Sequence, residues 1–206
     1  FITGHGDIDQ AVRLMRAGAA DYFMKPFELD DFLIRLGELM RPRPAGGSDV
    51  LGLAPAMKDL ERLLLRVAKV GSTVLITGET GSGKEVAARF LHAMSSAEGR
   101  PFMAVNCAAI PGDLLESELL GHEKGSFTGA AQRHLGYAER AGEGILFLDE
   151  IGELRSELQA KLLRLIEEKS YYRVGGERPI PFKGRLVVAT NANLAKLVEA
   201  GKFRED

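Results

Sequence analysis

From residue 50 onward, short continuous apolar runs alternate with longer stretches in which apolar residues recur every three or four positions. Runs of the first kind are typical of strands in a parallel sheet, because both faces of such a sheet are covered. The second spacing is that of a helix with one buried face. The pattern predicts strands at residues 73–77, 102–105, 145–148 and 186–190, and helices at residues 57–70, 85–94, 113–120 and 154–168.

The pattern before residue 50 is shorter and indicates the end of a separate domain. It predicts a strand at residues 1–3, a helix at 7–17, a strand at 21–24 and a helix at 29–40. Two short strands and two helices bury too little surface to fold alone. Prolines and glycines then follow closely and interrupt any helix. We therefore expect the last part of one α/β domain at residues 1–41, a linker at 42–49 and a second α/β domain at 50–206.

Composition and charge narrow the class of protein. The 27 Lys and Arg residues and 29 Asp and Glu residues give a formal net charge of −2, which provides no general attraction for nucleic acid. The single cysteine, Cys107, rules out an intrachain disulfide framework and is typical of a reducing, cytoplasmic location. No apolar run approaches the roughly 20 residues that span a membrane. Because the chain does not begin with Met, we expect an internal part of a longer cytoplasmic protein without membrane contact.

A glycine-rich segment after the first predicted strand of the second domain indicates a phosphate-binding loop. It reads Gly78-Glu79-Thr80-Gly81-Ser82-Gly83-Lys84-Glu85 and fits the pattern G-x-x-x-x-G-K between a strand and a helix. Glycines let backbone N–H groups converge on phosphate oxygens, and Lys84 supplies a charge for the β and γ phosphates. A glycine-rich turn that binds nothing is the alternative. Glu85 stands where the general pattern has a Mg²⁺-binding Ser or Thr, so the metal must rely on other groups.

The next carboxylates follow the predicted strand at 145–148. Asp149 and Glu150 form the apolar-strand-then-acid arrangement called Walker B, in which Asp149 holds Mg²⁺ and Glu150 activates the attacking water. Solvated turn carboxylates are the alternative explanation when such a pair stands alone. Behind a phosphate loop in the same domain, the pair predicts a nucleotide hydrolase.

Two more predicted strands also end in polar residues. Asn106 follows the strand at 102–105, where it is placed to direct Glu150 or, alternatively, to bond the backbone of its own turn. Thr190 and Asn191 end the last predicted strand and are candidate sensors of the γ-phosphate. Ligands of parallel sheets bind beyond the carboxyl ends of the strands, so these residues are expected to meet. The chain lacks an Asn/Thr-Lys-x-Asp guanine motif, which favours ATP.

These residues and several further motifs resemble the central domain of the sigma-54-dependent transcriptional activators, a branch of the AAA+ ATPases. The resemblance covers residues 50 to 206 and includes Glu at the position of Glu85. Its further motifs are Val105-Asn106-Cys107, Glu118-Leu119-Leu120-Gly121-His122-Glu123, Gly125-Ser126-Phe127-Thr128-Gly129-Ala130 and Phe203-Arg204-Glu205-Asp206. The resemblance implies a P-loop AAA+ parallel sheet with helices on both faces.

The most specific of these motifs runs from Gly125 to Ala130. In the family this loop engages sigma-54 and moves with the nucleotide state, and Ser126 is a small residue in the place of another small residue. Phe127 and Thr128 would offer a ring and a hydroxyl to the partner. The alternative for a Phe between glycines is a plug in the core beneath a loop.

The resemblance also implies an assembly. Asn106 matches the residue that restrains the Walker B glutamate, and Arg204 matches the first of two arginines that act on a neighbouring subunit's ATP. A ring, expected to be a hexamer, follows from such an arginine. The second arginine, a helical lid and a helix-turn-helix module that binds enhancer DNA would lie beyond Asp206.

Residues 1–41 resemble the C-terminal part of a response-regulator receiver domain, which has a (βα)5 fold. The motifs that carry this resemblance are Ile2-Thr3-Gly4-His5-Gly6-Asp7, Gly18-Ala19-Ala20-Asp21-Tyr22 and Lys25-Pro26-Phe27. By resemblance, Thr3 and Lys25 contact the acyl phosphate and Tyr22 reorients on phosphorylation, which makes a sensor histidine kinase a partner. A half-buried strand aromatic is the alternative for Tyr22.

The sequence therefore predicts a two-component regulator that hydrolyses ATP to remodel sigma-54 RNA polymerase into the open complex. Two alternatives stay open. In one, the protein is a binding regulator controlled by phosphorylation, and its AAA+ core binds ATP only to form oligomers. In the other, the chain is an AAA+ remodeller of a different protein.

Overall fold

The computed structural model describes residues 2–3, 23–24, 51–52 and 54–206. The chain divides into two units, Phe1–Pro44 and Ala45–Asp206. In the first unit, β1 (Ile2–Thr3) and β2 (Phe23–Met24) pair in parallel. Both lie where the sequence predicts strands. The predicted helices of this unit, together with Tyr22 and Lys25, lie outside the described residues, and of Thr3 only the backbone is described.

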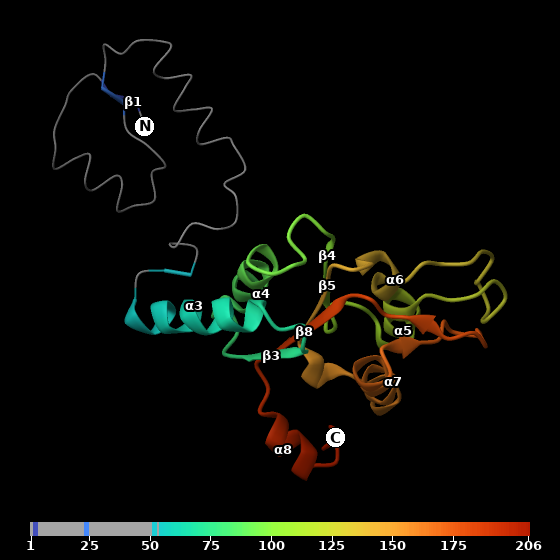
Figure 1. Cartoon of the computed structure of the whole chain (residues 1–206). Helices are drawn as coiled ribbons and strands as arrows, with labels where there is room; N and C mark the ends of the chain where they lie inside the picture. Colours follow the sequence, from blue (N-terminus) through green and yellow to red (C-terminus); the bar gives the residue numbers. More distant parts are fainter. Residues whose placement is uncertain (1, 4–22, 25–50, 53) are drawn as a thin grey trace. The chain divides into compact units, whose positions relative to one another are not determined.

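The second unit is built on a four-stranded parallel sheet (Figure 1). Its strands lie in the order β3-β8-β5-β4, so consecutive strands of the chain are joined by crossovers. The strands are β3 (Val74–Thr77), β4 (Phe102–Asn106), β5 (Ile145–Asp149) and β8 (Arg185–Thr190). Each lies within a residue or so of the strand that the apolar runs predict. Because all strands point the same way, their carboxyl ends lie at one edge.

Helices cover both faces of this sheet, as the continuous apolar strands require. The helices α3 (Pro55–Ala68) and α4 (Lys84–Ala93) lie against one face, and α5 (Gly112–Leu120), α6 (Tyr137–Ala141) and α7 (Ser156–Glu167) lie against the other (Figure 1). Successive residues of β5 serve the two faces in turn. Ile145 and Phe147 are buried with α3 and α4, and Leu146 and Leu148 with α5, α6 and α7.

Short elements complete the unit, and the apolar pattern predicts none of them separately. A turn of 3-10 helix, η1 (Ile151–Glu153), follows β5, and α8 (Leu194–Glu199) follows β8. Between α7 and β8, an antiparallel hairpin forms from β6 (Ser170–Tyr171) and β7 (Ile180–Pro181). Elements of two to six residues are too short to show a repeated hydrophobic pattern. Among the described residues, no helix is both long and apolar enough to cross a lipid bilayer.

The longest connection, between α5 and α6, lies beside the β6–β7 hairpin (Figure 1). Backbone N–H of Val174 donates to Gly121 O at 2.9 Å, and Glu123 N donates to Val174 O at 3.0 Å. This connection contains the residues from Gly125 to Ala130. The fold therefore supports that segment from two sides, by its own helix and by the hairpin.

A nucleotide-binding edge and its loop

The glycine-rich segment forms the connection between β3 and α4. Gly81 and Gly83 have φ angles of 79° and 86°, which L-residues with a Cβ adopt only at a cost. At Gly78 a side chain would meet Ser82 Oγ at 2.7 Å. The turn is closed by Ser82 N, which donates to Glu79 O at 3.2 Å. The three glycines thus allow the tight curvature that a phosphate-binding loop requires.

Lys84 begins α4 and lies beneath this loop. Its side chain is buried, and Nζ donates to Gly78 O at 3.1 Å and to Glu79 O at 3.2 Å. The same Nζ lies 3.8 Å from Glu150 Oε1, at the end of β5. The ammonium therefore sits between the phosphate loop and the Walker B glutamate. The carboxylate of Glu85, the next residue, accepts hydrogen bonds from the Arg89 guanidinium on the exposed surface of α4. The contacts described for Glu85 include none to Lys84 or Glu150.

The end of β5 carries the two predicted carboxylates in different settings. Asp149 Oδ1 accepts from Glu150 N at 2.9 Å. Glu150 has a φ of 55°, a left-handed conformation that is uncommon outside glycine and is found at functional sites. Its Oε2 accepts from Asn191 N at 3.3 Å, while Oε1 faces Lys84. The strained turn thus aims the Glu150 carboxylate between β5, β8 and the phosphate loop.

The end of β8 joins the loop by two further contacts. Thr190 is fully buried, and its backbone O accepts from Gly78 N at 3.2 Å. Asn191 is exposed, and its Nδ2 donates to Thr80 Oγ1 at 2.8 Å. The sequence predicts both residues as sensors, and the structure brings both to the phosphate loop. The bond between Asn191 and Thr80 is a contact that the sequence alone does not reveal.

Asn106 lies next to Asp149 in the paired strands, as expected. Its amide oxygen accepts from Ala108 N at 2.9 Å and from Ala109 N at 3.2 Å. The oxygen therefore bonds the backbone of its own turn, which is the alternative that the sequence left open. The hydrogen bonds described for Asn106 do not include one to Glu150. Its restraint of Glu150 stays a prediction.

Cys107 follows Asn106 and is held against β5, since its backbone N donates to Asp149 O at 3.0 Å. Burial, together with the negative charges of Asp149 and Glu150, raises the pKa of the Cys107 thiol to about 12. The thiol is therefore protonated at neutral pH and is a poor nucleophile. Among the described residues, no cluster of three or more His, Cys, Asp and Glu side chains has a metal-binding arrangement.

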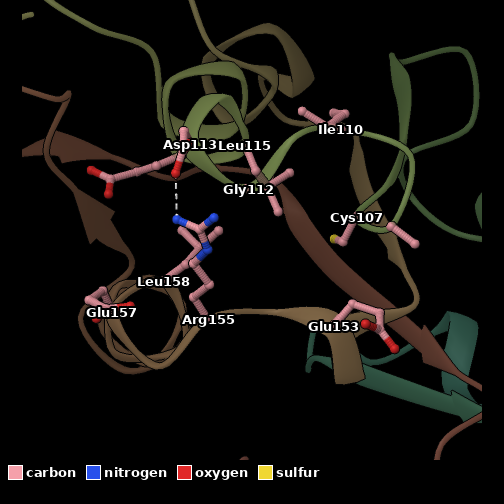
Figure 2. Close-up of a pocket in the computed structure, with 11 residues that line it drawn as sticks. Cys107, Ile110, Gly112, Asp113, Leu115, Glu153, Arg155, Glu157 and Leu158 are labelled. Atoms are coloured by element: carbon pink, nitrogen blue, oxygen red, sulfur yellow. Dashed lines mark hydrogen bonds and ion pairs between the residues drawn. The ribbon is translucent and has the colours of Figure 1, made fainter.

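A cavity of about 560 Å³ lies beside Cys107, and its lining residues include none from the phosphate loop (Figure 2). Its wall includes Cys107 and Glu153, which follow the ends of β4 and β5. Arg155 Nη1 donates to Asp113 Oδ1 at 2.6 Å, which links the start of α7 to the first turn of α5 (Figure 2). The turn after Walker B is thereby connected to the helix that leads to the Gly125–Ala130 loop.

Arg204 lies near the end of the chain, on the exposed surface. Its guanidinium donates to both carboxylate oxygens of Asp206, at 2.8 and 2.5 Å. Its backbone N donates to Gln159 Oε1 of α7 at 2.9 Å. The hydrogen bonds and ion pairs described for Arg204 include none to the phosphate loop of its own chain. The sequence pattern does not indicate a role for Gln159, because a polar residue beside an apolar helical stripe usually lies on the exposed face of the helix.

The loop from Gly125 to Ala130 is closed by its own backbone. Gly125 N donates to Ala130 O at 2.8 Å, and Ala130 N donates to Phe127 O at 3.0 Å. The Phe127 side chain is 40% exposed, and its ring packs edge-on against His122 with centroids 4.9 Å apart. Phe127 is therefore not a plug in the core. Thr128 beside it is exposed.

Ser126 contacts the hairpin from the inner side of the loop. A Cβ on Gly175 would meet the Ser126 Cβ at 2.5 Å, so only glycine fits there, where φ is 71°. The Ser126 hydroxyl is buried, and no hydrogen-bond partner is described for it. Packing against Gly175 therefore holds Ser126 in place, because no hydrogen bond is described for its hydroxyl.

A largely buried arginine holds the base of the loop. The Arg173 side chain is 11% exposed, and its guanidinium donates to Glu123 Oε1 at 2.8 Å and to Glu139 Oε2 at 2.6 Å. Burial lowers the pKa of Arg173, but the hydrogen bonds to the two carboxylates outweigh it and leave the pKa above its ordinary value. Arg133 adds an exposed contact to Glu139 at 3.2 Å. No pattern in the sequence indicates this network, because its members lie far apart along the chain.

Comparison with known proteins agrees with this geometry. Residues 50–206 match the sigma-54 interaction domain. The whole chain is 49% identical to the response regulator protein FleR of Pseudomonas aeruginosa and 44% identical to the DNA-binding transcriptional regulator NtrC of Escherichia coli. It spans 44% and 46% of these two proteins.

A solved structure, that of NtrX from Brucella abortus in complex with ATP, resembles the whole chain with a TM-score of 0.71 and 36% identity, over 46% of that protein. NtrX has also been solved with ADP. The parallel sheet with helices on both faces is thus the fold expected from the motifs. The chain belongs to the sigma-54-dependent transcriptional activators.

Proposed function

We propose that this chain hydrolyses ATP and uses the energy to remodel sigma-54 RNA polymerase. The observation that supports the proposal most is the convergence of Lys84, Glu150 and Asn191 at one sheet edge, in a chain of this family. A charge for phosphate, a carboxylate for water and a polar sensor are the parts that phosphoryl transfer requires.

ATP and Mg²⁺ fit the residues that are present. The glycine turn of the phosphate loop and the amino end of α4 suit a triphosphate, because both direct N–H groups toward negative charge. Asp149 is half-buried with one oxygen bonded to Glu150 N, and it would hold Mg²⁺ together with phosphate oxygens. When bound, Mg²⁺ neutralises charge that develops on the phosphates.

The protein's own groups have separate tasks in this mechanism. Lys84 exchanges its contacts with Gly78 O and Glu79 O for phosphate oxygens, which also removes its charge from Glu150. Glu150, held by its strained turn and by Asn191 N, then orients and deprotonates the attacking water. Thr190 and Asn191 sense the γ-phosphate through their contacts with the loop.

The remaining roles belong to the assembly. Arg204 is exposed and acts on the ATP of a neighbour in a ring, expected to be a hexamer, while Asn106 restrains Glu150 until hydrolysis. The loop from Gly125 to Ala130 engages sigma-54, and its exposed Phe127 and Thr128 make the contact. The likeness to response regulators supports a receiver domain at residues 1–41 and a sensor histidine kinase as a partner. Enhancer DNA would be bound by a module outside this chain.

The experiment that tests this proposal is capture of purified sigma-54 by the intact protein in the presence of ADP and aluminium fluoride. ADP with aluminium fluoride mimics the transition state of ATP hydrolysis, and native gel electrophoresis detects the captured sigma-54. We expect capture by the wild type and none by Thr128→Ala, whose ATP hydrolysis stays measurable.

Each other outcome would contradict part of the proposal. Hydrolysis without capture by the wild type would favour an AAA+ remodeller of another protein. Binding of ATP with oligomerisation but without hydrolysis would favour the regulator that uses ATP only to assemble. Equal capture by Thr128→Ala would remove the loop from the interaction.

A further inference from the structure

A buried glutamine connects the Walker B side of the fold to the segment that carries Arg204. Gln159 lies on α7 and is only 6% exposed. Its Nε2 donates to Leu154 O at 2.7 Å and to Lys202 O at 3.0 Å, and its Oε1 accepts from Arg204 N at 2.9 Å. Both hydrogens of the amide are therefore used, and so is its oxygen.

These three bonds join segments that are far apart in the sequence. Leu154 directly follows η1, the turn that begins directly after Glu150. Lys202 and Arg204 lie more than forty residues beyond Gln159. The amide of Gln159 therefore fixes the backbone of the Arg204 segment relative to the turn that follows Walker B.

The Arg204 segment has few other supports. Lys202 N and Phe203 N both donate to Leu197 O of α8, at 2.8 and 3.2 Å, and Phe203 packs partly into the core. Beyond Phe203 the chain is exposed, and the Arg204 guanidinium is paired with Asp206 on the surface. Gln159 contacts the backbone of Arg204 and leaves the guanidinium able to reach another molecule.

We propose that Gln159 is a positioning residue for Arg204 and sets the geometry with which this arginine reaches the ATP of a neighbouring subunit. The inference rests on the proposed function, in which Arg204 acts in trans. An arginine that stabilises transferred phosphate works only in the right place, and a displacement of about 1 Å can lower a rate on the order of 100-fold. Because Gln159 also bonds the carbonyl of Leu154, the position of Arg204 is tied to the same turn that aims Glu150.

The test uses mixtures of variant subunits of the intact protein. Gln159→Met keeps the length of the side chain and removes its hydrogen bonds. Alone, it should bind ATP like the wild type and hydrolyse it on the order of 100-fold more slowly. Lys84→Ala subunits are expected to be inactive alone because they lack the phosphate-binding charge, but their Gln159 and Arg204 are intact. Mixed rings should regain hydrolysis, since a Gln159→Met site can receive Arg204 from a Lys84→Ala neighbour.

Arg204→Ala is the matched control, and it should be inactive alone and rescued by Lys84→Ala in the same mixtures. Failure of that rescue would refute the trans role of Arg204, and with it the proposed function. Rescue of Arg204→Ala without rescue of Gln159→Met would overturn only the present inference. It would mean that Gln159 acts within its own subunit, through Leu154 and the Walker B turn.

A second variant separates positioning from general folding. Gln159→Glu keeps an acceptor for Arg204 N but, as a carboxylate, loses both donated bonds, so its activity should lie below that of the wild type. It takes the place of Gln159→Met in the mixtures if thermal unfolding shows that the latter does not fold. The inference would also be overturned if light scattering showed that the variants fold but no longer form rings. The loss of ATP hydrolysis would then result from a loss of assembly.

Discussion

The nucleotide edge and the Gly125–Ala130 loop are held in place by different kinds of contact. At the edge, the functional residues continue directly from β3, β5 and β8, and backbone hydrogen bonds between neighbouring strands fix their spacing. The loop is supported at its base by side chains, above all by Arg173 with Glu123 and Glu139. A substitution of one of these side chains should therefore displace the loop and leave the nucleotide edge intact.

The two regions are connected mainly by α5. This helix begins shortly after Asn106 and ends at the base of the loop, and its Asp113 pairs with Arg155 beside the Walker B turn. Both partners of that pair are largely exposed, so the pair contributes little to stability. The helix itself shares a buried core with β5 through Leu119 and its neighbours.

The largest expected effect comes from a change confined to the nucleotide edge. Glu150→Gln keeps the size of the side chain but removes the base, so hydrolysis should fall by about 100-fold to 10,000-fold while ATP still binds. Steady-state phosphate release and binding of a fluorescent ATP analogue measure the two properties. Undiminished hydrolysis would show that Glu150 does not activate the water.

An intermediate effect is expected at the base of the loop. Arg173→Met removes the guanidinium, which leaves Glu123 without its described partner and Glu139 with only the exposed Arg133, and this should lower the free energy of unfolding by about 2 to 3 kcal/mol. ATP binding should survive, and capture of sigma-54 should be lost. Chemical denaturation and the capture experiment are the measurements.

Arg133→Ala is the control for this change, because Arg133 contacts the same Glu139 from an exposed position. It should cost less than about 1 kcal/mol and leave capture unchanged. Equal effects of the two variants would mean that burial of Arg173 does not set the strength of the network. Loss of ATP binding in Arg173→Met would contradict the independence of the two regions.

The smallest effect is expected from Ser126→Ala. The buried Ser126 hydroxyl has no described partner, so its removal should leave stability unchanged or raise it by up to about 1 kcal/mol. The contact with Gly175 depends on the β-carbon, which alanine keeps. Thermal unfolding and sigma-54 capture test both points. A clear loss of stability would indicate that the hydroxyl has a bound partner in solution.

Most of the fold follows from the sequence because its strands are continuous apolar runs and its main helices have regular apolar stripes. The phosphate loop and Walker B pair follow as well, since glycine, lysine and carboxylate types must appear there in a fixed order. The helix α6, the β6–β7 hairpin and α8 do not follow, because they are too short to show a period. The sequence leaves two partners open for the Asn106 amide, and only the structure shows that its oxygen bonds the backbone of its own turn.

The sequence by itself determined the α/β class and the family, and it predicts the phosphate loop and the carboxylates after β5. These are properties of adjacent residues, and they depend on residue type and local spacing. Only the tertiary structure decided that Arg173 is clasped by Glu123 and Glu139, that Asn191 bonds Thr80, and that Gln159 holds the backbone of Arg204. Those contacts join residues that are distant along the chain, and a single polar side chain has no periodic pattern that reveals which distant group it will meet.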